Sequence, residues 1–307
     1  MLISSKSLNE LRGRIFSEKK IFCRGLFLSA RWFVVSELSG SGLHLVILPN
    51  KETAEYCCAD LYGLVEGDKV FFLPETGSGV ERSNYKSSLG VQRTAAIDRI
   101  ISNKGENSII VSYPEALSEL IPCSKDIKDS VFTLKVGDEI SFDEMKERLS
   151  GQEFDKVDFV SAPGQYAVRG SIIDIFSYSY NNPYRLSFWG DEIEKINVFN
   201  CNTQLSISEE KQINIVSDII SSESENGQNI ISVLPKESTI WFDSSDMYKD
   251  KEFFSIASEF RRIFLDVPMS EDADDAINFN ISPQPVFNKN FELLTEDIRS
   301  RIENSYK

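Results

Sequence analysis

Residues 154–204 constrain the fold of this chain more than any other segment, because they read as a series of short antiparallel strands. Within this segment, the side chains from position 184 to 189 alternate between two faces of a sheet. One face is apolar and consists of Tyr184, Leu186 and Phe188. The other face carries Arg185, Ser187 and Trp189. Since arginine and tryptophan dominate binding hot spots, this second face predicts a contact surface for another protein.

An ordinary structural role explains the same residues equally well at this point. In that interpretation Trp189 is half-buried against a neighbouring loop and Arg185 forms a surface ion pair. Arg169, just before the apolar strand at 171–176, leaves a similar choice open. Its guanidinium either pairs with Asp174 or Asp191, or it lies on the same exposed face as Arg185, on a neighbouring strand. In an acidic protein, two arginines on one face would define a docking surface.

The length and charge of the chain limit what it can do. A chain of 307 residues suggests about two domains of ~150 residues each. The hydrophobic fraction of 41% is sufficient for their cores. The net charge is −15, whereas a protein whose main task is to grip a phosphate backbone requires a basic face. The chain as a whole should therefore be repelled by DNA.

The cysteines and the hydropathy pattern predict a soluble, cytoplasmic protein that does not bind a membrane. Five cysteines without C-x-x-C spacing are typical of reduced thiols, and they indicate neither a disulfide nor a metal site. No stretch approaches ~18 consecutive apolar residues. The N-terminus also lacks the basic-then-apolar pattern of a signal peptide.

Strands alternate with helices through roughly the first 120 residues, which predicts a parallel, doubly wound α/β sheet. Strands are expected at 43–48, 70–73 and 108–112, and helices at 5–16, 51–62, 90–101 and 113–120. A strand, a turn and a helix are also expected across 21–35. The continuous apolar run at 43–48 is typical of a strand that is covered on both faces.

After Pro122 the pattern changes to that of an inserted α+β domain with an antiparallel sheet. A strand at 130–136 and a helix at 141–149, capped by Ser141, precede the strand-rich segment. The α/β character returns from about Gln212. It is predicted to comprise a strand at 239–242, a helix across 251–264, an alternating segment at 277–281 and a final helix across 288–306. That last helix has no stop signal, which favours a chain taken from a longer protein.

The sequence offers no complete nucleotide-binding or catalytic motif. A P-loop requires G-x-x-x-x-G-K-[ST], because its lysine reaches the β- and γ-phosphates. The chain contains no Gly-Lys dipeptide, and the first strand-to-helix turn, at 25–32, holds bulky residues instead. His44, the only histidine, lies in an apolar strand and is interpreted as a hydrogen-bonded core residue, so no Ser-His-Asp or Cys-His site is expected. We predict a non-catalytic chain without a cofactor or metal of its own.

Several motifs carry a resemblance to a known family. The strongest are VDFVSAPGQYAVRGSIIDIF at 157–176 and NPYRLSFWGDEIEKINVFNCNTQ at 182–204. Weaker matches lie at 71–88, 109–117 and 281–298. Together they resemble the UvrB-like region of bacterial transcription-repair coupling factors (Mfd), and they cover nearly the whole chain.

The resemblance implies a fold, a partner and a site. It implies a helicase-like, RecA-like domain 1A at 1–121, an inserted domain 2 at 122–211, and a domain 1B at 212–307 that completes the first domain. Domain 2 of this family recruits UvrA, and the positions matching its contact residues are Arg169, Arg185 and Trp189. Related sequences commonly have phenylalanine where this chain has Trp189. The resemblance also implies masking of this surface by a C-terminal domain, with RNA polymerase, DNA, ATP and Mg²⁺ bound by other domains.

Two rivals share parts of this pattern. UvrB itself has the same domain 2, but it requires an intact P-loop near residue 30 and an aromatic-rich DNA-binding hairpin after Pro74. Residues 76–88 are too polar for that hairpin. An ATP-dependent helicase fragment is the rival of a different class, and the missing P-loop lysine argues against it. The coupling-factor interpretation is therefore preferred.

Overall fold

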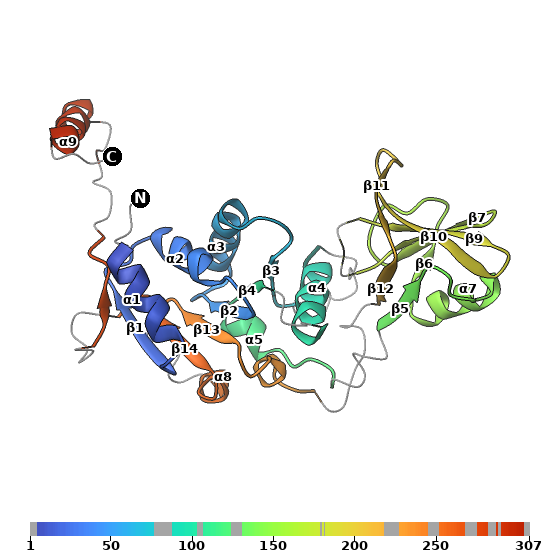
Figure 1. Cartoon of the computed structure of the whole chain (residues 1–307), viewed down its shortest axis with the longest axis horizontal. Helices are drawn as coiled ribbons and strands as arrows, with labels where there is room; N and C mark the ends of the chain where they lie inside the picture. Colours follow the sequence, from blue (N-terminus) through green and yellow to red (C-terminus); the bar gives the residue numbers. More distant parts are fainter. Residues whose placement is uncertain are drawn as a thin grey trace.

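The protein forms an elongated molecule in which two sheet-based units lie toward opposite ends (Figure 1). The structure is a computed structural model. It describes residues 5–76, 88–102, 107–123, 131–178, 180, 182–217, 227–244, 252–267, 275–281, 287 and 290–303. Helix α4 (Ser88–Ser102) lies between the two sheets in this view. Helix α9 (Phe291–Glu303) stands apart, beyond the end of the molecule that is remote from the smaller sheet.

The larger unit is built on a seven-stranded sheet with the order β15-β1-β14-β13-β2-β4-β3, in which every neighbouring pair is parallel. Its strands are β1 (Lys20–Arg24), β2 (Leu43–Ile47), β3 (Val70–Phe72), β4 (Ser108–Ser112), β13 (Thr239–Phe242), β14 (Arg261–Phe264) and β15 (Ile277–Asn278). The last three strands follow the smaller unit in sequence, so the smaller unit is an insertion into the α/β unit. The predicted fold class is confirmed.

Helices flank the parallel sheet and cover a core on each of its faces. They are α1 (Ser5–Ile15), α2 (Ala30–Leu38), α3 (Lys51–Leu64), α4, α5 (Pro114–Ser118), the 3₁₀-helix η2 (Ile230–Val233) and α8 (Glu252–Ala257). Strand β2 shows why its sequence is continuously apolar. Leu45 and Ile47 enter the core on one face, whereas Val46 enters the core on the other.

His44 is a core residue, as predicted, and its hydrogen bonds fix its tautomer. The indole Nε1–H of Trp241 on β13 donates to Nδ1 of His44 at 3.1 Å. Since Nδ1 accepts this bond, the ring proton lies on Nε2, which donates to the carbonyl oxygen of Ser41 at 3.0 Å. The pKa of His44 is lowered to about 4, mainly by burial and to a smaller extent by the positive charge of Arg261, while the bond to Ser41 opposes this shift. His44 is therefore held neutral.

The helix predicted across 251–264 was wrong in its second half. Helix α8 is followed by strand β14, which pairs in parallel with β1 and β13. The buried residues Phe253, Ala257, Phe260 and Phe264 recur at helical spacing although α8, the turn after it and β14 supply them. Phe264 reaches the core from the strand, where its ring stacks on that of Phe242 at 5.0 Å between centroids.

The smaller unit contains a six-stranded sheet with the order β11-β10-β9-β8-β7-β6 and a separate pair, β12-β5. The strands are β5 (Val131–Lys135), β6 (Asp155–Lys156), β7 (Gln165–Arg169), β8 (Ile172–Phe176), β9 (Tyr184–Trp189), β10 (Glu192–Phe199), β11 (Ser206–Glu210) and β12 (Gln212–Val216). All pairs except β6–β7 are antiparallel. Helix α7 (Phe142–Gly151) begins at the predicted cap, where the Ser141 hydroxyl accepts from the Glu144 N–H at 3.1 Å.

The two chain segments that connect the units lie side by side. Ile121 and Gln228 form an isolated antiparallel bridge, with N–O distances of 3.0 and 2.8 Å. Strand β12, which begins at the predicted domain boundary, pairs along its whole length with β5 of the smaller unit. The boundaries at 121/122 and 211/212 stay predictions. Among the described helices, none has the length and apolar character needed to cross a bilayer.

Candidate protein-docking site

Strand β9 presents its side chains as its alternation predicts. Tyr184, Leu186 and Phe188 are buried in the core between the sheet and α7. Arg185 and Ser187 are partly exposed on the outer face. That face is the candidate docking site. Its strands are held in register by the core beneath them, because a shift of one residue would turn the apolar set outward.

Asp174 organises the outer face by accepting from two arginines. It lies directly opposite Arg185 in the β8–β9 pair and is 1% exposed. Nε and Nη2 of Arg185 donate to its two carboxylate oxygens at 2.7 and 2.9 Å. Nη2 of Arg169 contacts one of the same oxygens. The two guanidiniums thus converge on one buried carboxylate.

This arrangement settles where Arg169 lies. It is on the same face as Arg185, and it pairs with Asp174, as one of the two interpretations required. The expectation that it sits on a strand neighbouring that of Arg185 was wrong, because β8 lies between β7 and β9. The two arginines still meet, since a long guanidinium side chain from each outer strand reaches the carboxylate on the strand between them.

Arg185 is held on several sides. Its guanidinium carbon lies 4.1 Å from the ring centroid of the buried Phe199, and its Nη2 also donates to Oε1 of Gln204 at 2.8 Å. Hydrogen bonding to Asp174 raises the pKa of Arg185, although burial opposes this effect. Its side chain is 20% exposed and that of Arg169 is 35% exposed. Both are therefore ordered by the protein and accessible to a partner.

Trp189 is the most exposed aromatic residue of the smaller unit, with 78% of its surface accessible. It ends β9 just before a tight turn in which Gly190 has a positive φ of 63°. It lies four positions after Arg185, which places its Cα about 13 Å away along the same face. The alternative interpretation, a tryptophan half-buried against a loop, is wrong. A large exposed indole at a fixed strand end is typical of a binding surface.

Asp174→Asn is expected to destabilise the protein by about 2 kcal/mol, because two converging guanidiniums would lose their shared counter-charge. Urea unfolding followed by circular dichroism measures the change. Asp143→Asn is a matched control, because Asp143 is an exposed carboxylate that pairs with Lys146 and such exposed pairs contribute little. Equal stability of the two variants would contradict the organising role of Asp174.

The carboxyl edge of the parallel sheet, where an α/β fold usually binds nucleotide, is occupied by internal contacts. Arg31, in the first turn of α2, contacts Asp243 after β13 and donates from Nη2 to Asp266 after β14 at 3.2 Å. Its Nε donates to the carbonyl of Leu26 at 3.2 Å. Burial raises the pKa of Asp266, and Arg31 opposes this shift. The positive charge of Arg31 is thus paired with carboxylates of the protein itself.

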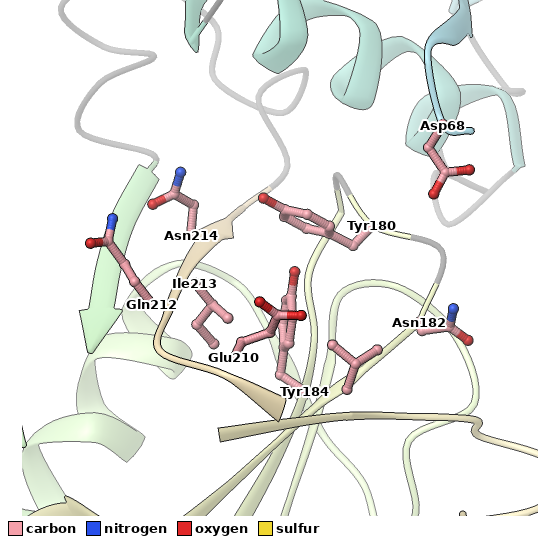
Figure 2. A pocket seen from close by; sticks show the side chains of 9 residues that line it. Asp68, Tyr180, Asn182, Tyr184, Glu210, Gln212, Ile213 and Asn214 are labelled. Atoms are coloured by element: carbon pink, nitrogen blue, oxygen red, sulfur yellow. The ribbon is translucent and has the colours of Figure 1, made fainter. Parts of the chain in front are cut away.

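A pocket of about 340 Å³ lies between the smaller sheet and Asp68 of the α/β unit (Figure 2). Its walls include Tyr180 and Tyr184, whose rings contact edge-on at 5.2 Å, and the carboxylate of Glu210. Tyr184 points to the face of β9 opposite that of Arg185, so the pocket is separate from the docking face. Among the described residues, two carboxylates and no cation line it, which makes it unsuited to a phosphate group.

The family model of the UvrB interaction domain matches residues 132–219, a range that runs from β5 to the end of β12 and contains the whole docking face. The smaller unit is thus the part of the chain that matches the UvrB interaction domain. The chain is also similar to transcription-repair-coupling factors over about three fifths of its length, as its motifs indicated. It is 31% identical to that of Bacillus subtilis over 200 residues, which cover 64% of this chain and 17% of the relative.

Two further relatives agree with this assignment. The transcription-repair-coupling factor of Mycobacterium tuberculosis is 34% identical over 189 residues, covering 59% of this chain and 15% of the relative. The UvrABC system protein B of Bifidobacterium longum is 24% identical over 185 residues, covering 56% of this chain and 26% of the relative. The chain spans less than a fifth of the length of the coupling factors it matches.

Proposed function

We propose that this chain is a non-catalytic recruitment module that docks UvrA in transcription-coupled nucleotide excision repair. Arg169, Arg185 and Trp189 are its proposed contact residues. The observation that carries the proposal is a pair of guanidiniums fixed on one buried carboxylate, on the same face as an exposed indole. This face belongs to the unit that matches the UvrB interaction domain.

The free hydrogen-bond donors of this face define the partner chemistry. Among the described residues, the Nη1 groups of Arg169 and Arg185 have no acceptor. Each is a charged N–H group, which pairs most strongly with a carboxylate. Trp189 provides the apolar anchor beside them. The partner surface on UvrA is therefore expected to present an acidic side chain close to an apolar one.

We further propose that the chain neither binds nor hydrolyses ATP. Two observations support this: the absence of a Gly-Lys dipeptide and the contacts of Arg31 with Asp243 and Asp266 at the carboxyl edge of the sheet. From the family resemblance, we infer that ATP-driven translocation, RNA polymerase binding and DNA contact belong to other parts of the longer proteins. The masking of the docking face by a C-terminal domain is part of the same inference.

A calorimetric titration of the chain with UvrA tests the proposal. Saturable binding is expected, and its dissociation constant should rise between 0.05 and 0.3 M salt, a range over which the Debye length falls about 2.4-fold, because the contact is partly charge-steered. ATP titrated in place of UvrA should give no binding heat. The absence of any UvrA binding at low salt, or ATP binding at micromolar affinity, would overturn the proposal.

A further inference from the structure

Phe159 lies beside the docking face and is exposed to 61%. It belongs to the loop between β6 and β7, which the alternation argument does not cover. Its ring centroid lies 4.7 Å from the guanidinium carbon of Arg169. A cation at this distance from an aromatic ring is attracted to it. Each arginine of the docking face therefore has an aromatic neighbour, since Arg185 contacts Phe199 in the same way.

The two aromatic neighbours differ in exposure. Phe199 is fully buried in a small cluster on the outer face, together with Ala167 and Phe176, so it serves only as a support. Phe159 supports Arg169 and leaves more than half of its surface open to solvent. An exposed aromatic that supports a charged contact residue can also touch the partner of that residue.

The loop holds Phe159 outward by its own packing. The next residue, Val160, is 2% exposed and fills the small apolar cluster on the outer face. The side-chain oxygen of Gln165 accepts from the N–H groups of Ser161 at 2.9 Å and Ala162 at 3.0 Å. On the other side, the N–H of Val157 donates to the carbonyl of Tyr166 at 2.9 Å. Phe159 is thus presented by an anchored loop, which lowers the entropy cost of using it in a contact.

We infer that Phe159 is a fourth contact residue for UvrA and a positioning residue for Arg169. The inference rests on the proposed function. The partner carboxylate would bond the free Nη1 of Arg169, and an apolar partner side chain would cover the open surface of the ring. The docking face then extends from the strand end at Trp189 to the loop at Phe159, with the arginines on it.

Titrations with UvrA test this inference by substitution. Phe159→Ala is expected to weaken binding about tenfold, which is about 1.4 kcal/mol. Phe159→Trp keeps both the ring and the apolar surface and should bind like the wild type, whereas Phe159→Leu should show an intermediate loss. Phe16→Ala is the matched control, because Phe16 is 82% exposed and lies just after α1 of the α/β unit.

A double-mutant cycle with Arg169→Ala separates the two roles of the ring. If the ring positions the guanidinium, the fold-loss of affinity in the double variant is smaller than the product of the fold-losses caused by Phe159→Ala and Arg169→Ala. Losses that multiply fully would overturn the positioning role. Unchanged binding by Phe159→Ala, with a wild type that binds, would overturn the contact role. Absence of binding by the wild type would instead refute the proposed function itself.

Discussion

The double variant Arg185→Ala/Trp189→Ala is expected to bind UvrA about a thousandfold more weakly than the wild type. Truncating a central arginine or a large aromatic of an interface typically costs about 2 kcal/mol, which is roughly thirtyfold for each. The two losses should add in free energy, because the residues are about 13 Å apart and share no contact. Calorimetry or surface plasmon resonance measures the dissociation constants of both single variants and of the double variant.

The chain offers a closely matched control for this experiment. Arg12→Ala/Phe16→Ala likewise removes a guanidinium and an exposed aromatic ring at the same sequence spacing, from an exposed region of the α/β unit. It should bind UvrA like the wild type. Circular dichroism must show unchanged secondary structure in both double variants. If the Arg185/Trp189 variant binds as tightly as the control, these residues do not form the docking site.

Acidification from pH 7 to pH 4 is expected to cost about 3 kcal/mol of unfolding free energy through His44 alone. The pKa of His44 is lowered to about 4 in the folded protein, whereas an unfolded histidine has a pKa of about 6.5. Between these values the unfolded chain binds the proton and the folded chain does not. Stability is therefore fully present above pH 6.5 and is lost as the pH falls toward 4.

His44→Gln isolates this contribution from that of the carboxylates, which also titrate in acid. Glutamine has an oxygen that can accept from the indole N–H of Trp241, and it does not titrate. Urea unfolding at several pH values should show a shallower pH dependence for His44→Gln than for the wild type. If both proteins show the same pH dependence of the unfolding free energy, His44 does not contribute to the loss of stability in acid.

The sequence was sufficient where a pattern is local. The alternation from Tyr184 to Trp189 predicts the two faces of β9, because a strand allows only two side-chain directions. The apolar run of β2 predicts a strand covered on both faces for the same kind of reason. The α/β unit with an antiparallel insertion follows from the order in which these local patterns occur along the chain.

The sequence did not predict the features that depend on the order of strands within a sheet. The convergence of Arg169 and Arg185 depends on β8 lying between their strands, and that order is set by long-range packing. Phe159 was missed because a loop residue follows no period, so neither its exposure nor its contact with Arg169 leaves a pattern. The helix predicted across 251–264 was wrong for a different reason. The buried residues of α8, of the turn after it and of β14 together reproduce the spacing of a single helix.

The pairing of β5 with β12 brings the two ends of the smaller unit together. Val131 and Val216 are register partners, so the unit enters and leaves through two adjacent strands. Neighbouring strands lie about 5 Å apart, so the two ends of the unit are close together, and the bridge between Ile121 and Gln228 keeps the two connecting segments close as well. Such a cassette can be transplanted into another protein, or lost, without stretching the parent chain.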